Sequence, residues 1–107
     1  MNKVILVGRL VADPKLKTNA NNQEICSFTV AVNYINVKQP DYFDVTVWGK
    51  KGHNCNTYLK KGSRVCVSGL LKINNYESDG IKKISIEITA DDVMFLSPKK
   101  AVAKVVE

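Results

Sequence analysis

Residues 25–35 read ICSFTVAVNYI, and their side chains alternate between two classes. Smaller or polar residues take one parity, and larger apolar residues take the other: Cys26, Phe28, Val30, Val32 and Tyr34. Successive side chains of a β-strand point to opposite faces, so this period of two predicts a strand with one buried face. Tyr34 shares the parity of the buried residues but lies at the end of the run, so we expect it in the core or at its rim.

The next run along the chain, residues 41–48, reads DYFDVTVW and alternates in the same way. Its phenylalanine and valines are expected to fill the core, so Tyr42 and Trp48 must project from the opposite face. Large aromatic rings that face solvent indicate a surface that another molecule or segment covers. The two rings are six residues apart, about 20 Å along a strand, and each can stack on a different nucleic-acid base. Packing against a partner subunit or beneath a loop is the alternative that the pattern leaves open.

Further strand-like runs flank these two. Residues 4–11 form an apolar run in which Gly8 indicates a bulge or bend, and Asp13-Pro14 ends it. Strands are also expected from Arg64 to about Asn74 and over residues 81–89, joined by a hairpin turn at 77–80. Residues 93–96 form a short final strand-like piece.

One helix is expected, over residues 52–61. Cys55, Tyr58 and Leu59 fall on one side of it at helical spacing. Lys60 and Lys61 would complement the helix dipole in the last turn, and Gly62 would supply the left-handed cap.

Five strands, a bent first strand and a short helix between the third and fourth strands are typical of one architecture. We therefore expect an all-β, five-stranded OB-fold Greek-key barrel over residues 1–97. Residues 98–107 are expected to form a short, basic and flexible C-terminal tail.

The chain is basic. It carries 16 Lys and Arg against 10 Asp and Glu, and 13 against 9 without the residues from Ser97 onward. This balance favours a polyanionic partner. Lysines outnumber arginines by 14 to 2, which favours contacts to a phosphate backbone over reading of base edges. The candidate phosphate contacts are Arg9, just after Gly8, and the lysines that lie near Trp48 and Tyr76 in sequence: Lys50, Lys51, Lys72, Lys82 and Lys83. A solvated surface charge is the alternative for each of them. Tyr76, just before the hairpin turn, adds a third aromatic platform.

Catalysis, a metal site and a cofactor are not expected. His53 has no obvious carboxylate partner, and neither a glycine-rich phosphate loop nor a nucleophilic serine motif occurs. Three cysteines without a paired spacing argue against a disulfide framework or a structural zinc site. No signal peptide or membrane-length apolar run occurs, so we expect a cytoplasmic, nucleoid-associated protein.

Several short segments, in order, resemble bacterial single-stranded DNA-binding proteins from residue 2 to about 96. The segments are NKVILVGRL at 2–10 followed by DP at 13–14, FTVAV at 28–32, VWGK at 47–50, YLKKGS at 58–63 and VSG at 67–69. The resemblance implies an OB fold, sequence-tolerant binding of single-stranded DNA, and a homotetramer or dimer. It also implies that Tyr42, Trp48 and Tyr76 are stacking residues and that Tyr34 is a possible substitute for a further family aromatic.

The resemblance departs from typical cellular members at the C-terminus. Those members end in an acidic tip that recruits other proteins, whereas this sequence ends in a basic segment closing with KVVE at 104–107. Recruitment of replication or recombination proteins through such a tip is therefore not expected. A role in DNA replication, recombination or repair is the expected function. The alternatives are a related primosomal-type OB-fold protein that acts mainly as a protein-interaction module and, less favoured, an RNA-binding OB domain.

Overall fold

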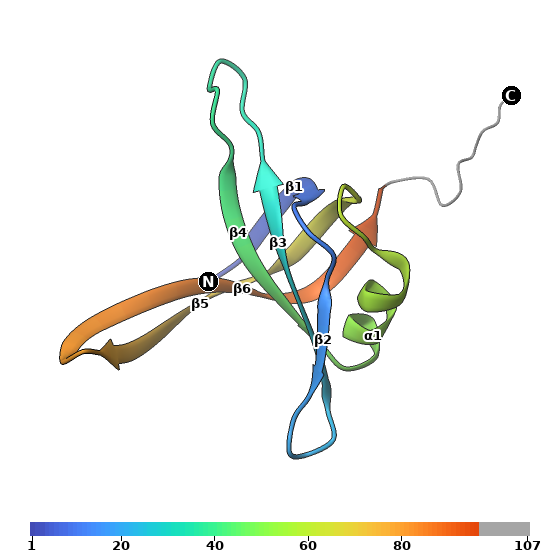
Figure 1. The fold of residues 1–107 in the computed structure, drawn as a ribbon. Coiled ribbons are helices and arrows are strands. Elements are labelled where there is room, and N and C mark those ends of the chain that lie inside the picture. The colour runs from blue at the N-terminus through green and yellow to red at the C-terminus, as the bar shows by residue number, and fades with distance from the viewer. Residues whose placement is uncertain (97–107) are drawn as a thin grey trace, which may run out of the picture.

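Strands make up most of the computed structural model, which describes residues 1–96 (Figure 1). The elements in chain order are β1 (Val4–Leu10), β2 (Lys15–Thr18), β3 (Glu24–Val32), β4 (Asp41–Trp48), α1 (Gly49–Tyr58), β5 (Arg64–Ser78) and β6 (Ile81–Phe95). Three hairpin connections project from the central barrel in Figure 1: those between β2 and β3, between β3 and β4, and between β5 and β6.

The sheet closes on itself. Its strand order is β1-β5-β6-β4-β3-β2, and β1 also pairs with β3, so five strands form a ring with β2 beside it. All pairings are antiparallel except that between β4 and β6. The helix α1 connects β4 to β5. The predicted all-β, five-stranded OB-fold barrel with one short helix is confirmed.

Gly8 lies where the barrel closes. Just beyond it, Arg9 and Leu10 are register partners of Ala31 and Val30 on β3. A β-carbon at Gly8 would collide with the carbonyl oxygen of Ala31. Glycine therefore permits the close approach of β1 to β3. The pairing of β1 with β5 continues in register through Gly8, so the feature at this position is not the bulge that the sequence suggested.

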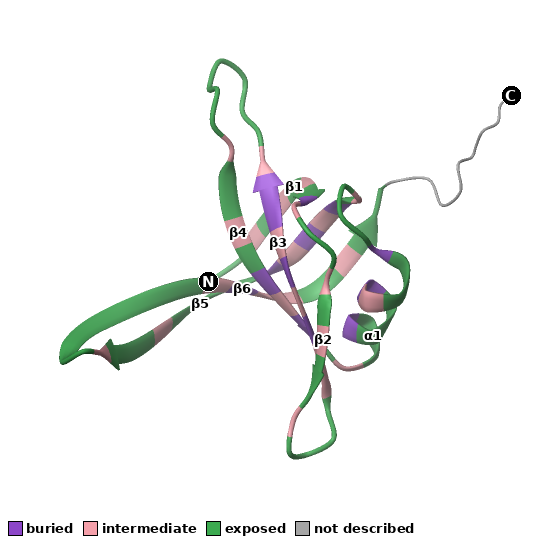
Figure 2. Cartoon of the chain, in the orientation of Figure 1, coloured by how far each residue is buried: buried purple, intermediate pink, exposed green. Residues whose placement is uncertain are grey.

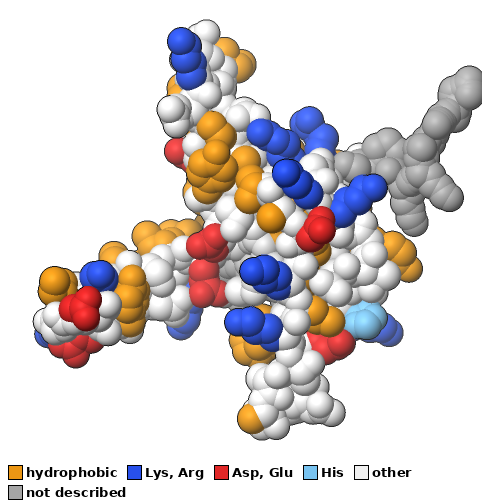
Figure 3. Space-filling model, viewed as in Figure 1, with side chains coloured by type: hydrophobic (Ala, Val, Ile, Leu, Met, Phe, Trp, Pro, Cys, Tyr) orange, Lys and Arg blue, Asp and Glu red, His pale blue; other side chains and the backbone are white. Residues whose placement is uncertain are grey.

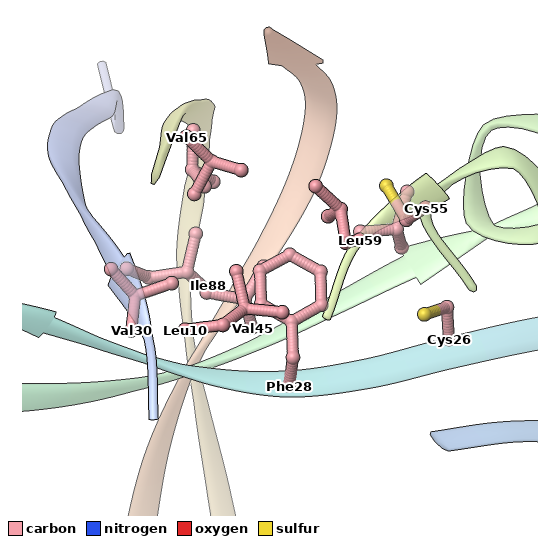
Figure 4. Close-up of a cluster of buried hydrophobic side chains, with 11 residues drawn as sticks. Leu10, Cys26, Phe28, Val30, Val45, Cys55, Leu59, Val65 and Ile88 are labelled. Atoms are coloured by element: carbon pink, nitrogen blue, oxygen red, sulfur yellow. The ribbon is translucent and has the colours of Figure 1, made fainter. Parts of the chain in front are cut away.

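The core lies inside the barrel and under α1. The predicted core face of β3 and β4 is largely buried, although Ala31, on the other parity of β3, is buried as well and Val32 and Phe43 are only partly buried (Figure 2). The other core residues come from β1, β5, β6, α1 and Leu59 just after the helix. Figure 4 shows these side chains meeting between the strands and the helix. Full burial of a valine, leucine, isoleucine or phenylalanine contributes about 1.5–3 kcal/mol. The cluster consists of Leu10, Cys26, Phe28, Val30, Val45, Val47, Cys55, Leu59, Val65, Val67 and Ile88.

The predicted helix is displaced by three residues, since α1 spans 49–58 instead of 52–61. Gly52 is buried against Val47, where a β-carbon would collide with the Val47 carbonyl oxygen, so this glycine lets the helix lie directly on β4. The chain is already extended at Leu59. Lys60 and Lys61 therefore lie beyond the last turn, and the prediction that they complement the helix dipole is wrong.

The strands also differ from the prediction. No strand was predicted over the residues of β2, β5 continues to Ser78 instead of ending near Asn74, and β6 runs unbroken from Ile81 to Phe95. A register shift lies between Ser68 and Gly69 in the pairing of β5 with β6. The predicted tail at 98–107 lies outside the described residues. Within residues 1–96, no helix combines the length and apolar character needed to span a bilayer.

Candidate nucleic-acid interface

The outer face of β4 presents the two predicted aromatic rings. Tyr42 is 62% exposed and Trp48 is 46% exposed, whereas the intervening Val45 and Val47 are buried in the core. Asp44 lies between the rings on the same parity. The prediction that the rings project outward while their neighbours fill the barrel is confirmed.

A surface groove of about 370 Å³ runs over the outer face of β3 and β4, between the segment around residues 12–15 and the base of the β5–β6 hairpin. Side-chain hydrogen bonds order its polar groups. Thr29 Oγ1 donates to Asp44 at 2.8 Å, and Thr46 Oγ1 donates to Glu87 at 2.7 Å. Asn74 Nδ2 donates to the other carboxylate oxygen of Glu87 at 2.8 Å. Glu87 therefore links the outer face of β4 to the hairpin.

The β5–β6 hairpin has two chemically different faces. On one face Tyr76, which is 49% exposed, is the register partner of Lys83, and Lys72 is the partner of Glu87. Because Glu87 also bonds Thr46, this face continues the outer face of β4. The other face is apolar and exposed, with the cross-strand partners Ile73 and Ile86 at its centre and with Leu71 and Ile84 beside them.

The predicted lysines divide according to these faces. Lys72 and Lys83 lie on the Tyr76 side, and Lys50 is exposed two residues after Trp48. Lys82 is the register partner of Glu77, so it projects from the opposite side of the hairpin. Lys51 turns toward β6. Its Nζ donates to the Asp91 carbonyl oxygen at 2.8 Å and lies 3.7 Å from an Asp92 carboxylate oxygen.

Arg9 and Tyr34 lie at the other end of the face. Arg9 projects outward from β1 beside Ala31, the register partner of Tyr42. Tyr34 lies beyond the end of β3 and is 44% exposed, so it occupies the rim of the barrel and not the core. Its hydroxyl donates to Asp41, and this hydrogen bond, aided by burial and by the Asp41 charge, raises the pKa of Tyr34. Since Asp41 and Tyr42 project from opposite faces of β4, Tyr34 is set apart from the other three aromatics.

Sequence reasoning missed the acidity of the groove. Asp13, Asp44 and Glu87 line it together with Lys15, and acidic side chains gather where the hairpin leaves the barrel, flanked by basic ones (Figure 3). Carboxylates repel phosphates but accept hydrogen bonds from base amino groups. The face therefore suits a nucleic-acid strand whose bases point toward the groove and whose phosphates follow the surrounding basic residues. These residues, Arg9, Lys50, Lys72 and Lys83, form the basic rim. The outward parity of Asp44 was visible in the sequence, but the approach of Glu87 to Thr46 depends on the pairing of distant strands.

The histidine and the two buried cysteines are accounted for by their immediate surroundings. His53 Nδ1 lies 3.1 Å from Glu24 Oε2, so the expectation that this histidine has no carboxylate partner is wrong. Burial raises the pKa of the Cys26 thiol to about 11 and that of Cys55 to about 12, so both are protonated at neutral pH. In the described part of the chain, no group of three or more His, Cys, Asp or Glu side chains is placed to hold a metal.

This geometry defines the class of the protein: an OB-fold domain whose open outer face carries aromatic rings and a basic rim. A family model described as "Single-strand binding protein family" matches residues 1–96. The chain therefore belongs to the single-strand binding protein family, as the resemblance in the sequence predicted.

Curated relatives agree with this assignment. Single-stranded DNA-binding protein 1 of Clostridium acetobutylicum is 40% identical over 109 residues, which cover 94% of this chain and 97% of the relative. The single-stranded DNA-binding protein of Staphylococcus aureus strain MRSA252 is 39% identical, with coverage of 94% and 69%. That of Bacillus cereus is 40% identical, with coverage of 92% and 62%.

Proposed function

We propose that this protein binds and protects single-stranded DNA on the outer face of its barrel, without a strong base preference and without catalysing a reaction. The observation that carries the proposal is the exposure of Tyr42 and Trp48 on one face of β4, continuous with Tyr76 through the hydrogen bonds of Glu87. Base–aromatic stacking contributes about 1–3 kcal/mol per base and tolerates any base, because every base has a π-face. The family and the names of the relatives support the same ligand.

The basic rim supplies the electrostatic part of binding. Lys50, Lys72, Lys83 and Arg9 lie around the stacking rings and would neutralise phosphates, whereas Lys51 and Lys82 make smaller contributions because they face elsewhere. Neutralising phosphates releases counterions, so affinity for a single strand falls with log salt at a slope of about −0.7 per contact. The expected cellular role is in DNA replication, recombination or repair, in the cytoplasm.

Fluorescence anisotropy with labelled oligo(dT) tests the proposal. We expect tight binding in 50 mM salt, a steep linear loss of affinity as salt rises, and weaker competition by RNA of equal length. Equal competition by duplex DNA, or an affinity independent of salt, would contradict it.

We also propose that the protein forms a homo-oligomer, a homotetramer or a dimer, through the apolar face of the hairpin. Ile73 is 51% exposed, Ile84 59% and Ile86 50%, and contiguous apolar surface of this kind marks an interaction site. A second copy is the expected occupant, since a self-complementary patch closes with two-fold symmetry. The mass from light scattering should be a multiple of 11.9 kDa. Ile84→Lys should lower that mass, and the control Ser85→Lys, on the opposite face, should not.

The exposed apolar face also favours a second candidate function, a module that binds other replication proteins. Under that alternative the protein would be monomeric by light scattering, and oligo(dT) would bind only weakly.

A further inference from the structure

We propose that Asp44 gives the interface a modest preference for bases that carry an exocyclic amino group, namely cytosine, adenine and guanine, over thymine. This inference rests on the proposed function and deepens it, because stacking tolerates every base and Asp44 adds a discrimination at one position of the bound strand. The residue is exposed and projects from the outer face of β4, between Tyr42 and Trp48. At about 3.4 Å per residue, it lies about 7 Å along the strand from Tyr42 and about 14 Å from Trp48.

The carboxylate of Asp44 is held in place by one of its two oxygens. Thr29, the register partner of Asp44 on β3, donates its hydroxyl hydrogen to Oδ1 at 2.8 Å. Within the described part of the chain, Oδ2 takes part in no hydrogen bond or ion pair. Glu87 differs, because Thr46 and Asn74 donate to its two carboxylate oxygens at 2.7 and 2.8 Å. Asp44 therefore offers an oriented carboxylate oxygen to a ligand, whereas Glu87 does not.

The groove around Asp44 presents hydrogen-bond acceptors. An ionised carboxylate only accepts, so the hydroxyl hydrogens of Thr29 and Thr46 point at carboxylates and their oxygens are left as acceptors. A base edge that meets this surface must donate. The amino groups of cytosine, adenine and guanine are donors. Thymine carries a carbonyl oxygen in place of the cytosine amino group, and its one ring N–H lies between two carbonyl oxygens, which a carboxylate repels.

Two lysines of β2 favour the orientation in which base edges face Asp44. Lys17 is the register partner of Ile25, and Ile25 is the partner of Trp48. Directly paired residues project from the same face of a sheet, so Lys17 lies on the outer face, about 10 Å across two strands from β4. Lys15, two residues away on the same parity, lines the groove, and both lysines are exposed. Phosphates are attracted to this side and repelled by Asp44, so the base edges are directed toward the carboxylate.

Binding of oligo(dC) and oligo(dT) of equal length tests the inference, because the two pyrimidines offer rings of the same size for stacking. One base-edge contact discriminates by about 5- to 150-fold, and an exposed carboxylate should lie at the lower end. We therefore expect Asp44→Asn to lower the ratio of the oligo(dT) Kd to the oligo(dC) Kd about fivefold, measured by anisotropy at fixed salt and pH 7. The asparagine amide keeps the shape of the side chain, removes its charge and can donate to a thymine carbonyl oxygen.

Two controls separate a contact to the amino group from a general loss of negative charge. Asp79→Asn removes the same charge from the exposed hairpin turn and should leave the ratio unchanged. On the ligand side, an oligonucleotide of deoxyzebularine, which is deoxycytidine without its amino group, should bind the unaltered protein about fivefold more weakly than oligo(dC). That difference should shrink in Asp44→Asn.

An unchanged ratio for Asp44→Asn, or an equal change for Asp79→Asn, would overturn the inference. Circular dichroism of each variant checks the fold. The deoxyzebularine comparison uses the unaltered protein, and equal affinities for it and for oligo(dC) would also overturn the inference. Failure of the unaltered protein to bind any of these oligonucleotides would instead overturn the proposed function.

Discussion

Replacing Tyr42 and Trp48 by alanine, singly and together, tests whether the two rings stack on different bases. The rings are six residues apart on one strand, about 20 Å, and each is roughly half exposed, so each has one ring face available for a base. Loss of one stacking platform should reduce affinity by about 1–3 kcal/mol, which is about 5- to 150-fold. We expect Trp48→Ala to lie toward the upper end because the indole is the larger ring.

The separation of the rings also predicts additivity. Sites more than about 10 Å apart, without shared partners, give additive effects within about 0.5 kcal/mol. The double variant should therefore lose about 2–6 kcal/mol of binding free energy to a 16-nucleotide oligo(dT), measured by anisotropy at fixed salt.

A matched control comes from Tyr58, an exposed tyrosine of α1 whose ring packs against Phe95 at a centroid distance of 6.4 Å. Tyr58→Leu should leave the affinity unchanged, because this ring lies away from the outer face of β4. A coupling energy well above 0.5 kcal/mol between Tyr42 and Trp48, or an equal loss for Tyr58→Leu, would refute the independent-platform reasoning.

Three further predictions concern the scaffold. Gly8→Ala should lower the free energy of unfolding by at least about 1–3 kcal/mol in a denaturant titration, because the added methyl group forces β1 away from β3; an unchanged midpoint would contradict the close approach. At pH 8 a thiol reagent should label Cys66 quickly and Cys26 and Cys55 only on unfolding, since burial and raised pKa values protect the latter two. Hydrogen bonds from Ser68 and Lys3 lower the pKa of Asp91 in the folded protein. The ionised carboxylate therefore stabilises the fold at every pH above the ordinary aspartate pKa. This stabilisation is lost as the pH falls through the lowered pKa. Asp91→Asn should therefore melt below the unaltered protein at pH 7 and together with it at about pH 2.

Much of the fold could be predicted because its strands bury one face and expose the other. The alternation in residues 25–35 and 41–48 identified the buried residues of β3 and β4, and with them the outward aspect of Tyr42 and Trp48. The turn at 77–80 was equally clear, since Asp79 and Gly80 both adopt positive φ.

Other features depended on contacts that no local pattern contains. The strand β2 reads Lys-Leu-Lys-Thr and is too short and polar to predict alone; it is a strand because β3 offers it a pairing edge. The helix begins early because Gly52 fits against Val47. The groove is acidic because the parallel pairing of β4 with β6 brings Glu87 to Thr46.

The basic residues were the least predictable part of the interface. Proximity in sequence grouped Lys82 with Lys83 and Lys50 with Lys51, although strand alternation separates the first pair and ion pairing with Asp92 draws Lys51 toward β6.

Emission from Trp48, the single tryptophan of the chain, tests the central claim most directly. Stacking of a base on the indole should quench this emission in proportion to the bound oligo(dT), with saturation at the stoichiometry found by anisotropy. Emission that stays constant while the oligonucleotide binds would mean that the strand follows another surface.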